Sequence, residues 1–129
     1  MIRRREFLTG LAAALAGAGA SALAACARED PLERALRGFF ADREAARKVG
    51  QEVLALEPDA GTPQLLVERL ARGREADLRE LAGSDPEGLT ERLREQHRAD
   101  FSEDRVVVVR GWVLSQTEAW LLALAALPE

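Results

Sequence analysis

Apolar residues recur every three or four positions through most of the chain after residue 30, and this spacing predicts a series of short amphipathic helices. Each expected helix opens with a polar residue that can cap its first turn. In three cases a proline follows, which suits the first helical position. The four expected starts are Asp30-Pro31, Asp42, Thr62-Pro63 and Asp85-Pro86.

The second helix is expected to run from Asp42 to about Leu56 and to bury one stripe of side chains. That stripe consists of Ala45, Val49, Val53 and Leu56. Gly50 lies inside the same helix and weakens it by up to about 1 kcal/mol relative to alanine. A close crossing with another helix would explain the glycine.

The pattern changes after Asp104, where four consecutive valines, residues 106–109, favour a β-strand over a surface helix. Arg110-Gly111 follows, and two interpretations are open. One is a tight hairpin turn, although a type I′ turn needs positive φ at both positions and an arginine resists that. The other is a single bent strand with Gly111 at a bulge.

The last helix is expected from Gln116 to about Leu127, with Ser115 and Glu118 at capping-box spacing. Residues 119–127 contain no polar side chain, and a helix that is apolar on all sides is buried. The valine run likewise needs cover on both faces. Either this C-terminal unit is the centre of the core, or part of it contacts a partner. The candidate interface residues are Val107, Val109, Trp112, Trp120 and Leu124.

These elements predict a mainly α fold over residues 31–129: a small helical bundle with a short β-hairpin or bent strand before the C-terminal helix. About 100 residues are enough for one small domain with its own core. No disulfide can support that core, because Cys26 is the only cysteine in the chain.

The first 25 residues indicate an export signal. Arg4-Arg5 precede Phe7-Leu8, which open an alanine-rich apolar stretch that continues to Ala25. A basic start, an apolar middle and a small-residue end define a secretory signal, and paired arginines resemble the twin-arginine (Tat) signal of bacteria. We therefore predict a Tat-type signal peptide over residues 1–25, recognised through Arg4, Arg5, Phe7 and Leu8. A membrane-spanning helix is the alternative.

Two cleavage sites are compatible with the end of this signal. Ala22-Leu23-Ala24 fits the A-x-A rule of an ordinary signal peptidase. Leu23-Ala24-Ala25-Cys26 resembles the lipobox of bacterial lipoproteins, in which the cysteine becomes the lipidated first residue. We favour lipidation of Cys26, with residues 26–30 as a short tether. Stable anchoring at a membrane takes more than one acyl chain.

Charge and composition narrow the function classes. The chain carries a net charge of −4, and the part after residue 25 carries −6, which argues against nucleic-acid binding. His97 is the only histidine, and no Cys/His motif, phosphate loop or serine with a neighbouring histidine is present. We expect His97 to be solvated or lightly packed. Asp100, Glu103 and Asp104 are expected to form a solvated acidic turn, with a calcium contact as the alternative. We predict no catalytic residue, metal or cofactor, and hence no enzyme activity.

The stretch from Asp100 to Ala119, with its valines, glycine, tryptophan and helix cap behind a twin-arginine signal, resembles a group of small bacterial Tat-signal proteins. Some members accompany periplasmic flavin- or quinone-linked dehydrogenases as small subunits. The resemblance implies a non-catalytic accessory subunit whose partners are the Tat machinery, a large dehydrogenase subunit and, through lipid, a membrane. The other hypothesis is a self-contained periplasmic lipoprotein with a structural or scaffolding role.

Overall fold

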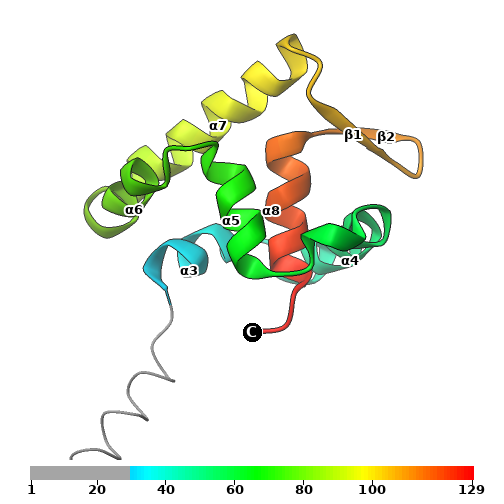
Figure 1. The fold of residues 1–129 in the computed structure, drawn as a ribbon, viewed down its shortest axis with the longest axis horizontal. Coiled ribbons are helices and arrows are strands. Elements are labelled where there is room, and N and C mark those ends of the chain that lie inside the picture. Colours follow the sequence, from blue (N-terminus) through cyan, green and yellow to red (C-terminus); the bar gives the residue numbers. More distant parts are fainter. Residues whose placement is uncertain (1–29) are drawn as a thin grey trace, which may run out of the picture. The chain divides into compact units, whose positions relative to one another are not determined.

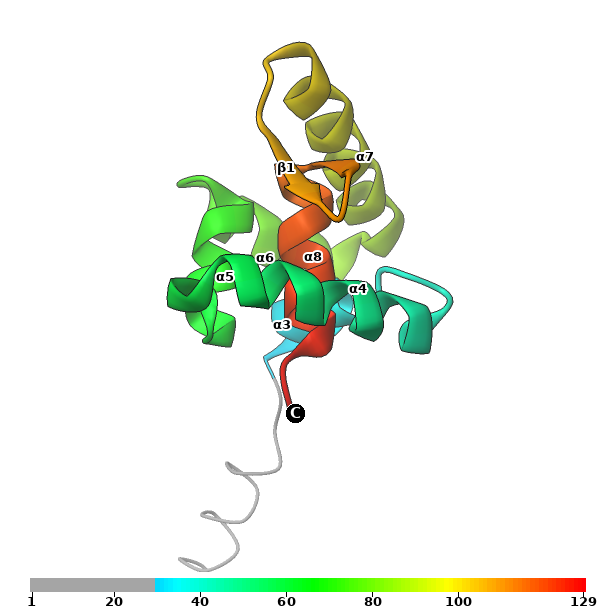
Figure 2. The ribbon, with the colours of Figure 1, turned by 90° about the vertical axis from the view of Figure 1, so that its right-hand side faces the viewer.

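Helix α8 (Gln116–Ala126) runs through the middle of the fold, and the other helices surround it (Figures 1 and 2). The computed structural model describes residues 30–129, of which Pro31–Glu129 form one unit. The elements before α8 are α3 (Pro31–Arg37), α4 (Arg43–Leu56), the 3-10 turn η1 (Pro58–Ala60), α5 (Pro63–Ala71), α6 (Glu75–Ser84), α7 (Pro86–Ser102), β1 (Val106–Val109) and β2 (Trp112–Ser115). The fold is therefore a small helical bundle with a β-hairpin before the C-terminal helix.

The predicted helix starts are confirmed, whereas the start of α6 at Glu75, which has no side-chain cap, is not among them. The side chains of Asp42, Thr62, Asp85 and Ser115 each accept a hydrogen bond from the backbone N–H three residues further on. Such caps satisfy donors that have no partner within the helix. Gly83 and Ser84 are residue types typical of loops, but here they form the end of α6.

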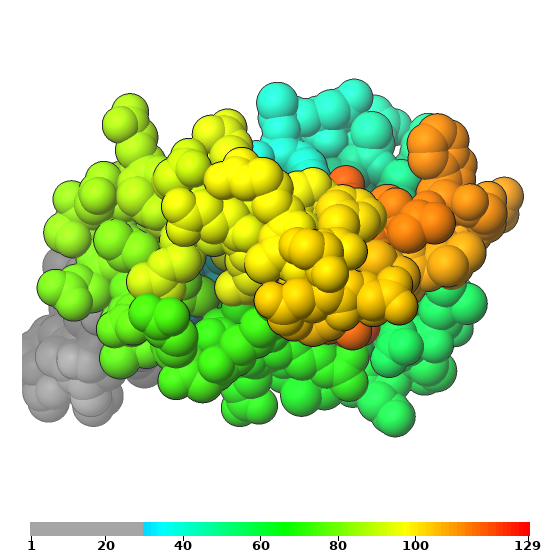
Figure 3. Space-filling model, turned by 90° about the horizontal axis from the view of Figure 1, so that it is seen from above, coloured from blue at the N-terminus to red at the C-terminus, as the bar shows by residue number. Residues whose placement is uncertain are grey.

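Burial of α8 is nearly complete. Every residue from Ala119 to Leu124 is buried, and α3, α4, α5 and α7 all pack against the helix. On the face shown in Figure 3, α8 is visible only as small orange-red areas between its neighbours. The prediction of a buried final helix is confirmed. Its uniform apolarity follows from having packing partners on all sides.

Charged side chains from two other helices hold the two ends of α8. At its start, the Asp100 carboxylate accepts a hydrogen bond from the Thr117 N–H at 2.7 Å. At its end, the buried Arg37 guanidinium donates to the carbonyl oxygens of Leu124, Leu127 and Pro128, at 3.0, 2.8 and 3.2 Å. A negative group at the N-terminus and a positive one at the C-terminus both complement the helix dipole. These hydrogen bonds also satisfy backbone N–H and C=O groups at the helix ends, which apolar side chains could not do.

Helices α4 and α8 cross closely at Gly50. A Cβ atom there would overlap the carbonyl group of Leu122, so the crossing requires glycine. The face of α4 that packs inward is Ala46, Gly50 and Val53. The predicted stripe is therefore wrong apart from Val53. The other three residues of the stripe are exposed: Ala45, Val49 (38%) and Leu56 (53%). The close crossing at Gly50 directs Ala46 and Gly50 toward α8, so the packing face of α4 lies about one residue further along the chain than predicted.

The valine run forms a hairpin, and the bent-strand alternative is wrong. Strands β1 and β2 are antiparallel, with Val107 opposite Leu114 and Val109 opposite Trp112. Arg110 and Gly111 form the turn with φ of 51° and 84°, so the arginine adopts the left-handed conformation that it ordinarily resists. The expectation of cover on both faces is also wrong. Val109 is buried on the inner face, whereas Val108 and Val113 are more than half exposed on the outer one.

Candidate functional site

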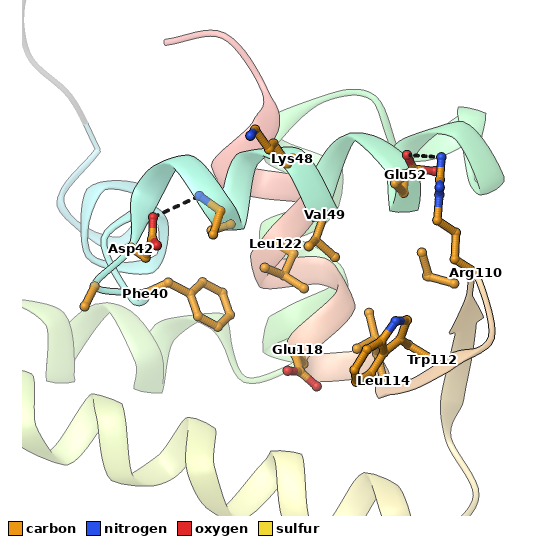
Figure 4. A pocket seen from close by; sticks show the side chains of 14 residues that line it. Phe40, Asp42, Lys48, Val49, Glu52, Arg110, Trp112, Leu114, Glu118 and Leu122 are labelled. Atoms are coloured by element: carbon orange, nitrogen blue, oxygen red, sulfur yellow. Dashed lines mark hydrogen bonds and ion pairs between the residues drawn. The ribbon is translucent and has the colours of Figure 1, made fainter.

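An apolar groove of about 730 Å³ lies between α4 and the hairpin (Figure 4). Side chains of α4 form one wall, Trp112 and Leu114 of β2 form the other, and Leu122 of α8 contributes to the floor. Phe40, in the loop before α4, borders one end, and Arg110 in the hairpin turn borders the other. We refer to this hollow as the α4–hairpin groove.

Two large apolar side chains of the groove remain open to solvent. Trp112 is 73% exposed and Val49 is 38% exposed. Trp112 pairs with Val109 across the hairpin, and paired residues point to the same face of a sheet. Because Val109 packs against the core, Trp112 is held on that same inner face, beside the groove. The strand thus holds the indole beside the groove but leaves it uncovered. Apolar surface of this kind is typical of binding sites.

Charged groups stand around this apolar surface. The Arg110 guanidinium pairs with the Glu52 carboxylate at 3.1 Å across one end. Asp42 caps α4 near the other end, and Lys48 lies on the α4 side. The half-buried Glu118 carboxylate forms no hydrogen bond or ion pair with residues 30–129. With Glu52 and Arg110 neutralising each other, the groove carries a small excess of negative charge.

A cluster of polar side chains surrounds Asp100. This residue is fully buried, so the prediction that it belongs to a solvated turn is wrong. Arg72 donates to both carboxylate oxygens, at 2.8 and 3.2 Å, and the Arg105 Nε donates to one of them at 3.0 Å. The Thr117 hydroxyl donates to the other oxygen at 2.7 Å. Burial by itself raises the pKa of Asp100, but these hydrogen bonds outweigh it and place that pKa below its ordinary value.

The hydrogen bonds of the Asp100 cluster hold three helices together. The cluster joins the end of α5, the end of α7 and the start of α8, and Gln96 extends it by donating to Leu70 O and to the Thr117 hydroxyl, both at 3.0 Å. No buried side-chain nitrogen or oxygen within residues 30–129 lacks a hydrogen-bond partner. The same residues contain no group of three His, Cys, Asp or Glu side chains arranged to hold a metal ion. Asp100 therefore has its acceptor positions occupied by the protein itself.

His97 contacts a serine that the sequence does not place beside it. Its Nδ1 lies 2.7 Å from the Ser115 hydroxyl, and its ring meets Phe101 edge to face at 5.2 Å. Ser115 is completely buried, and its oxygen also accepts the Glu118 N–H as the cap of α8. A capped and buried hydroxyl cannot reach a substrate, so the geometry makes this pair a link between α7 and α8. His97 is lightly packed, in line with expectation.

The predicted partner interface is only partly at the surface. Trp112 is exposed and Val107 is half-buried, but Val109, Trp120 and Leu124 are buried in the core. Trp120 lies under the Arg69 guanidinium, which is 4.8 Å from its ring centre. The expectation is wrong for these three residues. The helices around α8 cover it well enough to bury both Trp120 and Leu124.

The remaining predicted site residues, Arg4, Arg5, Phe7, Leu8 and Cys26, lie outside the described part of the chain. So does the apolar stretch that follows the arginines. Within residues 30–129, no helix combines the length and the apolarity needed to cross a membrane.

Sequence reasoning missed most of the groove. Ala45 and Val49 were assigned to the core, and Glu118 was interpreted only as part of a helix cap. One signal was available: the apolar residues of α4 cover a wider arc than one packing face needs. Comparisons with protein-family models, with curated proteins and with solved structures find no match to this chain.

Proposed function

We propose that this chain is a non-catalytic accessory subunit, exported by the Tat route, anchored through lipid on Cys26 and docked on a larger periplasmic oxidoreductase. The observation that carries the docking proposal is Trp112, which stands 73% exposed beside the α4–hairpin groove. Tryptophan is enriched at the centres of protein interfaces, where its large surface is removed from water. An anchor of this type, next to an open apolar groove, suits a docking protein.

The other parts of the proposal rest on the sequence. The twin arginines and the apolar stretch support export, and the lipobox-like end supports anchoring at Cys26. The resemblance to small Tat-signal proteins supports a dehydrogenase as the partner. The Tat route carries folded proteins, so a small subunit without a cofactor of its own can leave the cytoplasm together with a cofactor-bearing one.

Trp112→Ala should weaken the partner complex while leaving the fold intact. Removing a tryptophan anchor reduces binding by about 2 kcal/mol or more, which is roughly thirtyfold in Kd. The exposed indole contributes little to folding, so the urea midpoint should stay within experimental scatter. The measurement is co-purification of tagged full-length protein from its native membranes, quantified against wild type.

Leu56→Ala is the matched control for this experiment, because Leu56 is 53% exposed on α4 but does not line the groove. It should leave co-purification unchanged. If Trp112→Ala retains the partner as well as Leu56→Ala does, the groove is not the docking surface. Recovery of the wild-type protein alone would contradict the accessory-subunit proposal.

Replacing both Arg4 and Arg5 with lysine should retain the precursor in the cytoplasm, because the Tat receptor reads the arginine pair as an address.

Cys26→Ser should abolish labelling by a fatty-acid probe and release the protein from membranes. Cell fractionation and probe labelling measure the two effects separately. Unchanged export would remove the Tat assignment, and a wild-type protein that takes up no label would remove the lipid anchor.

The second candidate function is a self-contained periplasmic lipoprotein with a scaffolding role. The closed core favours it, since α8 has both ends capped from within the chain and both sides covered. Under this alternative Trp112 has no partner. Quenching by acrylamide would then be the same in native membranes as in purified protein, whereas docking would shield the indole.

A further inference from the structure

We propose that the partner enters the α4–hairpin groove with an α-helical segment, apolar on one face, that carries a lysine or arginine to pair with Glu118. This inference rests on the proposed docking function and specifies its chemistry. Three observations carry it: the shape of the groove, the lack of free backbone groups along its α4 wall, and the unpaired carboxylate that lines it.

The shape matches a helix. Lining residues on α4 extend from Asp42 to Glu52, which is about 15 Å at 1.5 Å per residue. About three turns of a second helix fit that length. The opposite wall consists of Trp112 and Leu114, and Figure 4 shows these side chains across the groove from Val49 and Leu122. An apolar helix face would fill the space between two such walls.

The α4 wall of the groove disfavours an extended segment. From Ala46 onward, the backbone N–H groups of α4 are hydrogen-bonded within the helix, whereas β1 and β2 pair only with each other and each strand therefore keeps one free edge. An extended peptide in the groove could pair with the hairpin edge on one side, but its N–H and C=O groups on the side of α4 would lose water without gaining partners. A helix satisfies its backbone internally and avoids that penalty.

Glu118 defines the charge of the occupant. A segment that covers the groove removes part of the water around this carboxylate, which also lines a second hollow together with Arg94 and His97 and forms no hydrogen bond or ion pair within residues 30–129. Removing water from an unpaired carboxylate is unfavourable, so an occupant that supplies a cation is favoured over one that does not. A second copy of this chain is disfavoured as the occupant, because two chains that each carry a net charge of −6 after residue 25 repel one another.

A photoreactive phenylalanine analogue in place of Val49, in full-length protein expressed in its native cells, tests the proposal directly. The same analogue in place of Gln51 is the control, because Gln51 is exposed on α4 but lies outside the groove. After irradiation, mass spectrometry identifies the segment joined to residue 49. We expect a stretch of the partner with apolar residues at helical spacing and a lysine or arginine among them.

Charge exchange provides the second measurement. Glu118→Arg should reduce the crosslink at residue 49 at least tenfold, and changing the partner's basic residue to glutamate should restore it. Glu95→Arg makes the same charge change at an exposed site on α7 outside the groove and should leave the crosslink intact. Equal crosslinking in the Glu118→Arg and Glu95→Arg proteins would overturn the assigned role of Glu118.

Other occupants overturn the proposal. A crosslink to a lipid, to a second copy or to residues 1–25 of the same chain would do so, as would an acidic or uncharged partner segment. Absence of a crosslink while the partner still co-purifies would reject the groove as the docking site but leave the accessory-subunit function in place. Absence of any co-purifying partner would reject that function as well.

Discussion

Asp100→Asn should lower the free energy of unfolding by about 3 kcal/mol, which is a large part of the stability of a small domain. Both carboxylate oxygens accept at least two hydrogen bonds, from Arg72, Arg105 and Thr117. The amide nitrogen of asparagine is a donor, so in either orientation it faces donors where the carboxylate offered acceptors. The two guanidinium groups also lose their counter-charge. Both retain some contact with solvent, which keeps the estimate at the lower end for a broken buried pair.

The same carboxylate should make stability depend on pH. The pKa of Asp100 in the folded protein is lowered from its ordinary value of 3.8. A group whose pKa is depressed by folding stabilises the folded state fully above the unfolded-state pKa. That contribution disappears as the pH falls through the folded-state value. We therefore expect wild-type stability to drop below about pH 4. The Asp100→Asn protein should lose less over the same interval, because it lacks this group.

Urea unfolding followed by circular dichroism at pH 7 and through the acid range measures both effects. Asp104→Asn is the matched control, since Asp104 is exposed and its backbone has a φ of 59°, a conformation that asparagine tolerates. It should change stability by no more than about 0.5 kcal/mol. If Asp100→Asn falls within that same range, the Asp100 cluster does not hold α5, α7 and α8 together.

Gly50→Ala should also destabilise the fold, by about 2 kcal/mol net, although alanine is the better helix former. A methyl group at this position overlaps the Leu122 carbonyl and contacts Ala126, and backbone atoms cannot move aside as a flexible side chain can. Helices α4 and α8 would have to separate, which reduces packing along the main contact of the core. Overpacking of this kind typically costs about 1–3 kcal/mol. That outweighs the gain of about 1 kcal/mol in helix propensity.

Gly83→Ala separates the two contributions. Gly83 lies in helix α6, and a Cβ atom there meets nothing within 4 Å. This substitution should stabilise the protein by up to about 1 kcal/mol through helix propensity alone. Thermal or urea unfolding of the two variants provides the comparison. Stabilisation by Gly50→Ala of the same size as by Gly83→Ala would mean that the α4–α8 crossing is looser than described.

Local chemistry made the helix starts and the general fold class predictable. The caps at Asp42, Thr62, Asp85 and Ser115 depend on a side chain and a backbone N–H three residues apart, so the sequence contains all the information they need. The uniform apolarity of residues 119–127 predicted a buried helix for the same reason. The composition of this one segment indicates that the helix is buried, whichever elements surround it.

The candidate site was less predictable, because it depends on which side of each element faces inward. The apolar arc of α4 allowed more than one packing face, and the crossing at Gly50 selected Ala46 and Val53 over Ala45 and Val49. The valine run had no alternation that could tell its inner face from its outer one. Three of the five expected interface residues are therefore buried in the core, whereas Ala45 and Val49, which were expected in the core, line the groove.

The sequence by itself determined where most helices begin, that the last one is buried and that a strand region precedes it, since each of these depends on residues close together in the chain. Only the tertiary structure decided that Arg37 and Asp100 close the two ends of α8 and that His97 meets Ser115. It also decided that Trp112 and Glu118 share one groove with Val49. The hydrogen bonds among these contacts join residues that lie 17 to 91 positions apart in the chain. No local pattern encodes the packing of helices that brings such residues together.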